Sequence, residues 1–105
     1  MAVIDVDLMN FGPEIQHSEV PVMLCLYAPA CAGCEPTLNA LDEVSQICGA
    51  KLKVCRANVA KHHIIGTAYD LTEVPTTFLI IRGEVAGRII GERTCAELLD
   101  FINWK

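Results

Sequence analysis

The feature that most constrains this chain is a pair of cysteines, Cys31 and Cys34, separated by two residues. The pair follows the apolar run Val22–Ala28 and precedes a segment with helical periodicity. A thiolate at a helix start is stabilised by unpaired backbone N–H groups and by the helix dipole, so its pKa falls below about 8.5. A second cysteine one turn later can attack a mixed disulfide formed at the first. The spacing therefore predicts a redox site with Cys31 as nucleophile and Cys34 as resolving thiol.

Two other uses of such a pair are a structural disulfide and half of a zinc site. A zinc site needs two further ligands at metal spacing, and the adjacent pair His62 and His63 lacks the separation of four residues that places two histidines on one helix face. We therefore expect these histidines to be solvated helix residues. Neither a bound metal nor a bound cofactor is predicted for this chain.

Composition and charge narrow the classes of function. The 105 residues, 52% of them hydrophobic and 20% charged, suit one compact domain spanning residues 1–105. A net charge of −5 without a basic run argues against nucleic-acid binding. The N-terminus lacks the basic region of a signal peptide, and the uncharged stretch Val20–Cys34 is too short and too interrupted by proline to span a membrane. We expect a cytoplasmic monomer in which most of the six cysteines are thiols.

The hydrophobic patterns predict an α/β domain with the order βαβαβαββα and a central mixed sheet flanked by helices. The predicted strands are Val3–Val6, Val20–Ala28, Lys51–Ala57, Thr76–Arg82 and Val85–Ile90. The first predicted helix is short and contains Leu8, Phe11, Pro13 and Ile15, and the third covers Val59–Tyr69. The second is long, covers Ala32–Cys48, ends at Gly49 and has an apolar face made of Leu38, Leu41, Val44 and Ile47. The last helix is capped by Thr94 and Glu97 and buries Leu98, Leu99, Ile102 and Trp104. Crossover connections should be right-handed and join parallel strands, and the hairpin that turns at Arg82-Gly83-Glu84 should be antiparallel.

This order, together with its motifs, resembles the thioredoxin family over essentially the full length. The motifs are Cys31-Ala32-Gly33-Cys34 after the second strand, Asn58 after the third, Val74-Pro75-Thr76 before the fourth, Gly83-Glu84-Val85 at the hairpin and Gly91 after the last strand. The resemblance implies a thioredoxin fold, a cis peptide bond before Pro75 and reduction of protein disulfides. It also implies substrate-binding roles for Ala30, Val74, Pro75 and Gly91. A thioredoxin reductase-like protein would supply the electrons.

The chain departs from the usual W-C-G-P-C-K sequence of this family. Ala30 replaces the aromatic residue, and Gly33 replaces the proline. The buried aspartate that usually assists the second cysteine is matched by Cys25, and its lysine companion by Arg56. Cys25 is either a small core residue or a proton-handling thiol, and Arg56 is either an ordinary strand-end charge or a cation that stabilises a thiolate. We also expect the Cys31–Cys34 couple to be less reducing than that of an ordinary thioredoxin.

The remaining cysteines, Cys48, Cys55 and Cys95, are expected to be packing or surface thiols, with an approach of Cys48 to Cys55 left open. Two functional alternatives also stay open. One is a non-catalytic thioredoxin-fold binding module, and the other is a glutaredoxin-like or oxidising thiol exchanger. The presence of both the C-x-x-C and the Val74-Pro75 motifs favours the reductase.

Overall fold

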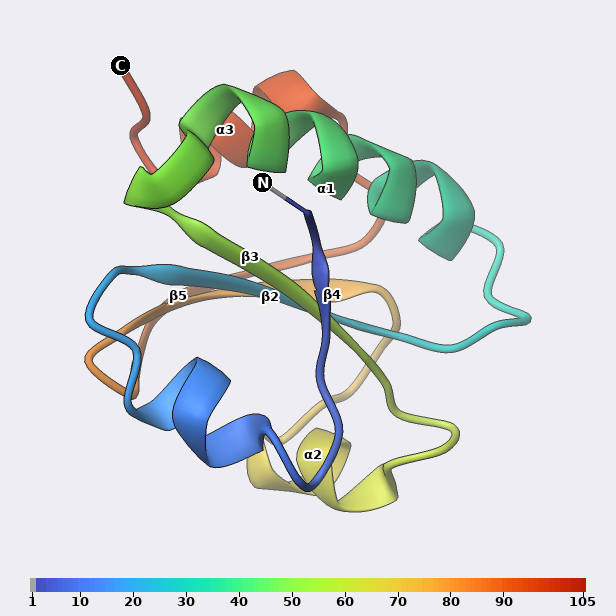
Figure 1. Ribbon diagram of the computed structural model, residues 1–105. Helices are drawn as coiled ribbons and strands as arrows, with labels where there is room; N and C mark the ends of the chain where they lie inside the picture. The colour runs from blue at the N-terminus through green and yellow to red at the C-terminus, as the bar shows by residue number, and fades with distance from the viewer. Residues whose placement is uncertain (1) are drawn as a thin grey trace.

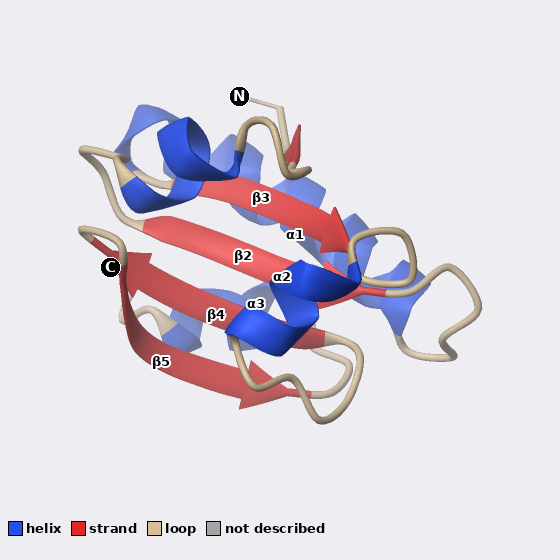
Figure 2. Ribbon diagram, turned by 90° about the horizontal axis from the view of Figure 1, so that it is seen from below, coloured by secondary structure: helices blue, strands red, loops and turns tan. Residues whose placement is uncertain are grey.

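The computed structural model, which describes residues 2–105, contains a five-stranded mixed sheet with helices on both faces (Figure 1, Figure 2). The strands are β1 (Ile4–Asp5), β2 (Val22–Tyr27), β3 (Lys53–Asn58), β4 (Thr76–Ile81) and β5 (Glu84–Ile90). The helical segments are the π-helix η1 (Gly12–Gln16), α1 (Cys34–Cys48), the 3₁₀ turn η2 (Gly49–Lys51), α2 (His63–Ala68) and α3 (Cys95–Phe101). The spatial order of the strands is β1-β3-β2-β4-β5. This confirms the predicted α/β class and the thioredoxin fold.

The direction of β4 corrects one expectation. Strands β1, β3 and β2 are parallel, but β4 runs antiparallel to β2, so the connection through α2 is not a parallel crossover. Helix α2 has six residues and is about 9 Å long, whereas a six-residue strand extends about 20 Å. The helix therefore cannot carry the chain back along the sheet, and β4 begins at the edge where β2 ends, with Thr76 paired to Leu26.

The sheet separates two hydrophobic clusters. Helices α1 and α3 cover one face, and η1 and α2 cover the other (Figure 1). Side chains along β2 alternate between them, so Met23 and Cys25 pack under α1 and α3 while Leu24 and Leu26 pack toward η1 and α2. We call these the α1/α3 face and the η1/α2 face. Cys48 and Cys55 belong to opposite faces, which removes the approach that the sequence had left open.

Helix α1 begins at Cys34, later than the predicted Ala32, and Gly33 is its N-cap residue. Its buried stripe includes Leu41 and Val44 as predicted, but Leu38 is only half-buried. Ile47 is 53% exposed, and Cys48 is buried in its place. Ile47 lies about 120° around the helix axis from the buried Leu41, whereas Cys48 returns to the same side. Gly49 ends the helix as predicted, with a positive φ of 55°.

The two helices of the η1/α2 face are shorter than predicted. Helix α2 starts at His63 because the side-chain oxygen of Asn58 accepts hydrogen bonds from the N–H groups of Ala60 and Lys61, at 3.0 and 3.1 Å, which hold the chain in a turn. Segment η1 buries Ile15 and has proline in its first turn as expected. Leu8, which we had placed on its apolar face, precedes it and is 56% exposed.

The last third of the chain follows the sequence prediction in its hairpin and helix cap, but of the side chains predicted to be buried by the last helix only Leu98 is buried, and Leu99, Ile102 and Trp104 are half-buried. Arg82 and Gly83 both have positive φ, 54° and 80°, as a tight two-residue β-hairpin turn requires. A Cβ at position 83 would also lie 2.9 Å from the carbonyl oxygen of Gln16. At α3 the Thr94 hydroxyl accepts from the N–H of Glu97, and the Glu97 carboxylate accepts from the N–H of Thr94, which completes the predicted capping box.

Candidate functional site

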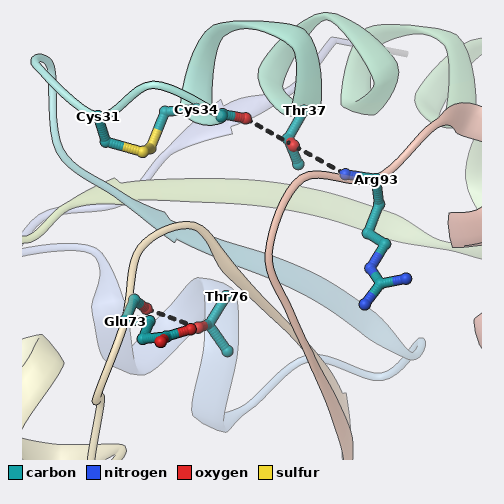
Figure 3. The surroundings of a disulfide bond; sticks show 7 residues. Cys31, Cys34, Thr37, Glu73, Thr76 and Arg93 are labelled. Carbon is teal, nitrogen blue, oxygen red and sulfur yellow. Dashed lines mark hydrogen bonds between the residues drawn. A yellow bond between two sulfur atoms is a disulfide. The ribbon is translucent and has the colours of Figure 1, made fainter.

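Cys31 and Cys34 form a disulfide, with their Cα atoms 5.3 Å apart (Figure 3). Cys34 is the first residue of α1 and is 2% exposed, whereas Cys31 is half-buried in the preceding turn. The helix was expected to start at Ala32, directly after Cys31, and it starts two residues later, so Cys31 lies in the turn before it. The turn is held by hydrogen bonds from the N–H of Cys31 to the oxygen of Ala28 and from the N–H of Cys34 to the oxygen of Cys31, both 3.3 Å. Cys31 is thus the more exposed residue of the pair.

The antiparallel register of the sheet brings the predicted substrate-binding segments to the same end of the strands as the disulfide. Thr76 at the start of β4 pairs with Leu26 near the end of β2, and also with Ile90 at the end of β5. The segments that carry Ala30, Val74-Pro75 and Gly91 adjoin these strand ends. The Val74–Pro75 peptide bond is cis, as the resemblance implied, and the N–H of Gly91 donates to the Pro75 oxygen at 2.8 Å.

Cys25 lies on the α1/α3 face, in register with Arg56 on β3 and Thr77 on β4. It is fully buried, and burial raises the pKa of its thiol to about 11. The Thr77 hydroxyl and the Arg56 charge lower that pKa, but they do not outweigh the desolvation. Cys25 is therefore a neutral thiol at neutral pH.

Arg56 lines a cleft of about 260 Å³ whose wall also includes Cys34, Glu35 and Tyr27. The Arg56 Nε donates to Oδ1 of Asp5 at 2.7 Å, and its guanidinium carbon lies 5.9 Å from the centre of the Tyr27 ring. The hydrogen bond to Asp5 is the main cause that raises the pKa of Arg56, so the group is a permanent cation. The cleft that reaches Cys34 thus has one positive side chain, Arg56, and one negative side chain, Glu35, on its wall.

Four cysteines are free thiols. Cys25, Cys48 and Cys55 are buried, and Cys95 is half-buried at the start of α3. Within residues 2–105 no three side chains of histidine, cysteine, aspartate or glutamate come together as metal ligands. In the same described part of the chain, no helix is both long and apolar enough to cross a bilayer.

Sequence reasoning missed a group of residues behind the disulfide, namely Thr37, Glu92 and Arg93. Thr37 is fully buried in the first turn of α1, and its hydroxyl bridges Gly33 to Arg93. The position of Thr37, four residues before Leu41 on the apolar stripe, could have indicated its burial. No local pattern identifies Glu92 or Arg93 as neighbours of the disulfide turn, because Glu92 meets Gly33 and the N–H of Arg93 meets Thr37 only across the fold.

Comparison with known proteins gives a consistent result. A family model described as Thioredoxin matches residues 2–104. A thioredoxin of Haemophilus influenzae is 27% identical over 101 residues, which cover 96% of this chain and 94% of that protein. A thioredoxin of Rickettsia felis is 31% identical over 94 residues, 90% of each chain. A thioredoxin of Griffithsia pacifica is 29% identical over 91 residues, 87% of this chain and 84% of that protein.

These matches span nearly the whole chain and confirm the resemblance drawn from its motifs. They agree with the fold and with a cysteine pair joined as a disulfide at the start of a helix. The chain therefore belongs to the thioredoxin family, and it is a thiol–disulfide oxidoreductase that reduces protein disulfides.

Proposed function

We propose that Cys31 is the nucleophile and Cys34 the resolving thiol of the exchange. The observation that carries this assignment is the difference in access between the two sulfurs, since Cys31 is half-buried and Cys34 is 2% exposed. A target disulfide therefore reaches Cys31 more readily than Cys34. Cys34, bonded to Cys31 in this structure, is placed to attack it.

The exchange proceeds in two displacements. The Cys31 thiolate attacks one sulfur of the target disulfide, and the other target sulfur leaves as a thiolate. Cys34 then loses its proton and attacks the Cys31 sulfur, so the bond between Cys31 and the target breaks. Two electrons and, after protonation, two protons have passed to the target, and the Cys31–Cys34 disulfide remains. A thioredoxin reductase-like protein restores the dithiol.

We propose that the target polypeptide binds along Ala30, Val74, Pro75 and Gly91. The support for this proposal is that all four residues adjoin strand ends at the same end of the sheet, together with the hydrogen bond between Gly91 and Pro75. Ala30 is exposed and Val74 is half-buried, so both have surface that a target polypeptide can contact. An extended segment could lie across them and present its disulfide to Cys31.

We propose that Arg56 and Cys25 affect the ionisation of Cys34 differently, Arg56 through its positive charge and Cys25 by staying neutral. Arg56 favours the Cys34 thiolate through its positive charge on the shared cleft. Cys25 keeps its proton at neutral pH, so it adds no negative charge to the α1/α3 face of the sheet. The usual carboxylate of the family would add such a charge, and its absence is consistent with altered proton transfer here.

The finer assignments of setting and partners are also proposals. We propose that the protein acts as a cytoplasmic monomer without a bound cofactor or metal. Its substrates would be proteins with accessible disulfides. The net charge of −5 supports the absence of a nucleic-acid partner.

Reduction of insulin disulfides by the reduced protein tests the roles of the two cysteines. Cys31→Ser should abolish both reduction and capture of the substrate. Cys34→Ser should abolish turnover but retain a mixed disulfide detectable by mass spectrometry. Cys95→Ser is the matched control, because Cys95 is the free cysteine that is not buried, and it should behave as the wild type. Equal capture by the Cys31 and Cys34 variants would contradict the assignment, and inactive wild-type protein would favour a binding module.

A further inference from the structure

The segment Gly91–Arg93 contacts two loops, namely the turn Cys31–Cys34 that holds the disulfide, which we call the redox turn, and the Val74-Pro75 loop. We infer that Thr37 is a positioning residue that fixes the redox turn to this segment. It thereby sets the spacing between the redox turn and the Val74-Pro75 loop, and the space between these two loops is the groove in which protein substrates would bind. The inference rests on the proposed roles of Cys31, Val74 and Gly91.

The first half of the argument is the environment of the Thr37 hydroxyl. Thr37 is fully buried in the first turn of α1. Its Oγ1 donates to the carbonyl oxygen of Gly33 at 2.9 Å and accepts from the N–H of Arg93 at 3.1 Å (Figure 3). The single donor of the hydroxyl and one of its acceptor positions are both used. Gly33 lies between the two cysteines, so this hydroxyl holds the redox turn directly.

The second half is the link from the same segment to the opposite loop. Two residues before Arg93, the N–H of Gly91 donates to the oxygen of Pro75 at 2.8 Å. The loop that carries Pro75 is itself closed by the Thr76 hydroxyl, which donates to the oxygen of Glu73 at 2.6 Å (Figure 3). Polar contacts therefore run from the redox turn through Thr37, Arg93 and Gly91 to the Val74-Pro75 loop.

Close packing between Gly33 and Glu92 reinforces this connection. A Cβ at position 33 would lie 3.0 Å from the Cβ of Glu92 and 3.6 Å from its Cα. A side chain at position 33 would therefore push the Gly91–Arg93 segment away from the redox turn. The hydrogen bonds of Thr37 require that this distance stays short, so Gly33 and Thr37 act together.

This arrangement predicts different effects on large and small substrates. A protein substrate that crosses the groove contacts both the redox turn and the Val74-Pro75 loop, so it depends on their spacing. A small aromatic disulfide such as 5,5′-dithiobis(2-nitrobenzoate) needs only access to the Cys31 sulfur. Loss of the Thr37 hydroxyl should therefore slow reaction with protein and spare reaction with the small disulfide.

The test compares Thr37→Val, which keeps the shape and removes the hydroxyl, with Thr37→Ser, which keeps the hydroxyl. For Thr37→Val we expect kcat/KM with insulin to fall on the order of tenfold, the equivalent of about 1.4 kcal/mol, through a rise in KM. The rate with the small disulfide should be unchanged, and Thr37→Ser should match the wild type. An unchanged ratio of the two rates in Thr37→Val would overturn the inference. Wild-type protein that reduces neither substrate would instead overturn the proposed function.

A second pair of variants decides the question if Thr37→Val does not fold. Gly33→Ala should lower the ratio of the insulin rate to the small-disulfide rate, because its Cβ displaces Glu92. Adding Glu92→Gly removes the opposing Cβ and should restore the ratio. If Gly33→Ala leaves the ratio unchanged, or if Glu92→Gly fails to restore it, the spacing of the two loops does not control the groove.

Discussion

The two faces of the sheet contain similar groups that have different surroundings, and strand β3 shows this with its two cations. Lys53, on the η1/α2 side, pairs with Glu14 at 2.9 Å, and Arg56, on the α1/α3 side, pairs with Asp5 at 2.7 Å. Both pairs are partly exposed, so each contributes at most about 1 kcal/mol to stability. Only Arg56 shares a cleft with Cys34. The same kind of ion pair is therefore structural on one face and adjacent to the chemistry on the other.

The two fully buried thiols of β2 and β3 repeat the contrast. Burial raises the pKa of Cys25 to about 11 and that of Cys55 to about 12. Cys25 lies in the row with Thr77 and Arg56, whose effects lower its pKa. Cys55 packs in the η1/α2 cluster, with Lys53 as its lowering influence and Glu14 opposing it. Burial alone keeps both thiols protonated at neutral pH. The two faces differ in the polar neighbours of the thiol, which are Thr77 and Arg56 for Cys25 and Lys53 and Glu14 for Cys55.

The largest expected effect is the removal of a core side chain from each face. Phe78→Ala in the η1/α2 cluster should cost about 3–5 kcal/mol of unfolding free energy, because it leaves a cavity at a fully buried site. Leu41→Ala on α1 should cost about 2–5 kcal/mol and should also shift the Cys31–Cys34 equilibrium with glutathione, since α1 carries Cys34. Urea denaturation and glutathione titration measure the two quantities. An equal redox shift in Phe78→Ala would remove the functional distinction between the faces.

The next effect appears at alkaline pH. Each buried thiol stays protonated in the folded chain, whereas the same thiol in the unfolded chain ionises near pH 9.0. Ionisation therefore lowers the free energy of the unfolded state, and stability falls as the pH rises. For Cys25 the loss should extend from pH 9.0 to about 11 and be on the order of 3 kcal/mol. Cys25→Ala and Cys55→Ala should each flatten this decline in urea denaturation curves. A change in the pH dependence between pH 6 and 8 in Cys25→Ala alone would mean that Cys25 ionises at neutral pH.

A smaller effect separates the two cations. Arg56→Met should raise the pH at which Cys34 resolves a mixed disulfide, because the positive charge that we propose favours its thiolate is lost. The slowing at pH 7 should be below about tenfold, since Arg56 is partly exposed to solvent. Lys53→Met is the matched control and should leave the pH profile unchanged. Stopped-flow decay of the mixed disulfide gives both profiles, and identical profiles would show that Arg56 is an ordinary strand-end charge.

The smallest effect concerns a helix cap on the α1/α3 face. Thr94→Ala removes the capping box of α3 and should cost about 1 kcal/mol in urea denaturation. The exchange rate should not change, because Thr94 caps α3 and not the helix that begins at Cys34. Thr67→Ala on α2 is the control, since Thr67 only donates to the His63 oxygen within its own helix. A slower exchange in Thr94→Ala would mean that fraying of α3 reaches the redox turn.

Local patterns predicted those parts of the fold that local forces determine. The strands, the cap at Thr94, the turn at Arg82-Gly83 and the C-x-x-C pair all depend on residues close together in the sequence. The direction of β4 depended on the true length of α2, which the Asn58 side chain shortens. A hydrophobic pattern does not register such a side-chain bond.

The candidate site divides in the same way. The C-x-x-C spacing identified Cys31 and Cys34, and the family resemblance identified the cis bond at Pro75, because these positions belong to sequence motifs. Neither could identify the bridge from Thr37 to Arg93, which joins residues 56 positions apart. Such a bridge is visible only once the chain is folded.

Strand β5 has a consequence for association between sheets. It is the outer strand beside β4, and an outer strand can template pairing with another chain. Leu79 is opposite Gly87 while Ile80 is opposite Val85, so Ala86 is an extra residue that interrupts the ladder. Such a bulge bends and twists the edge locally. A foreign strand would therefore find no straight run of backbone groups along β5, and this irregularity protects the molecule against edge-to-edge aggregation.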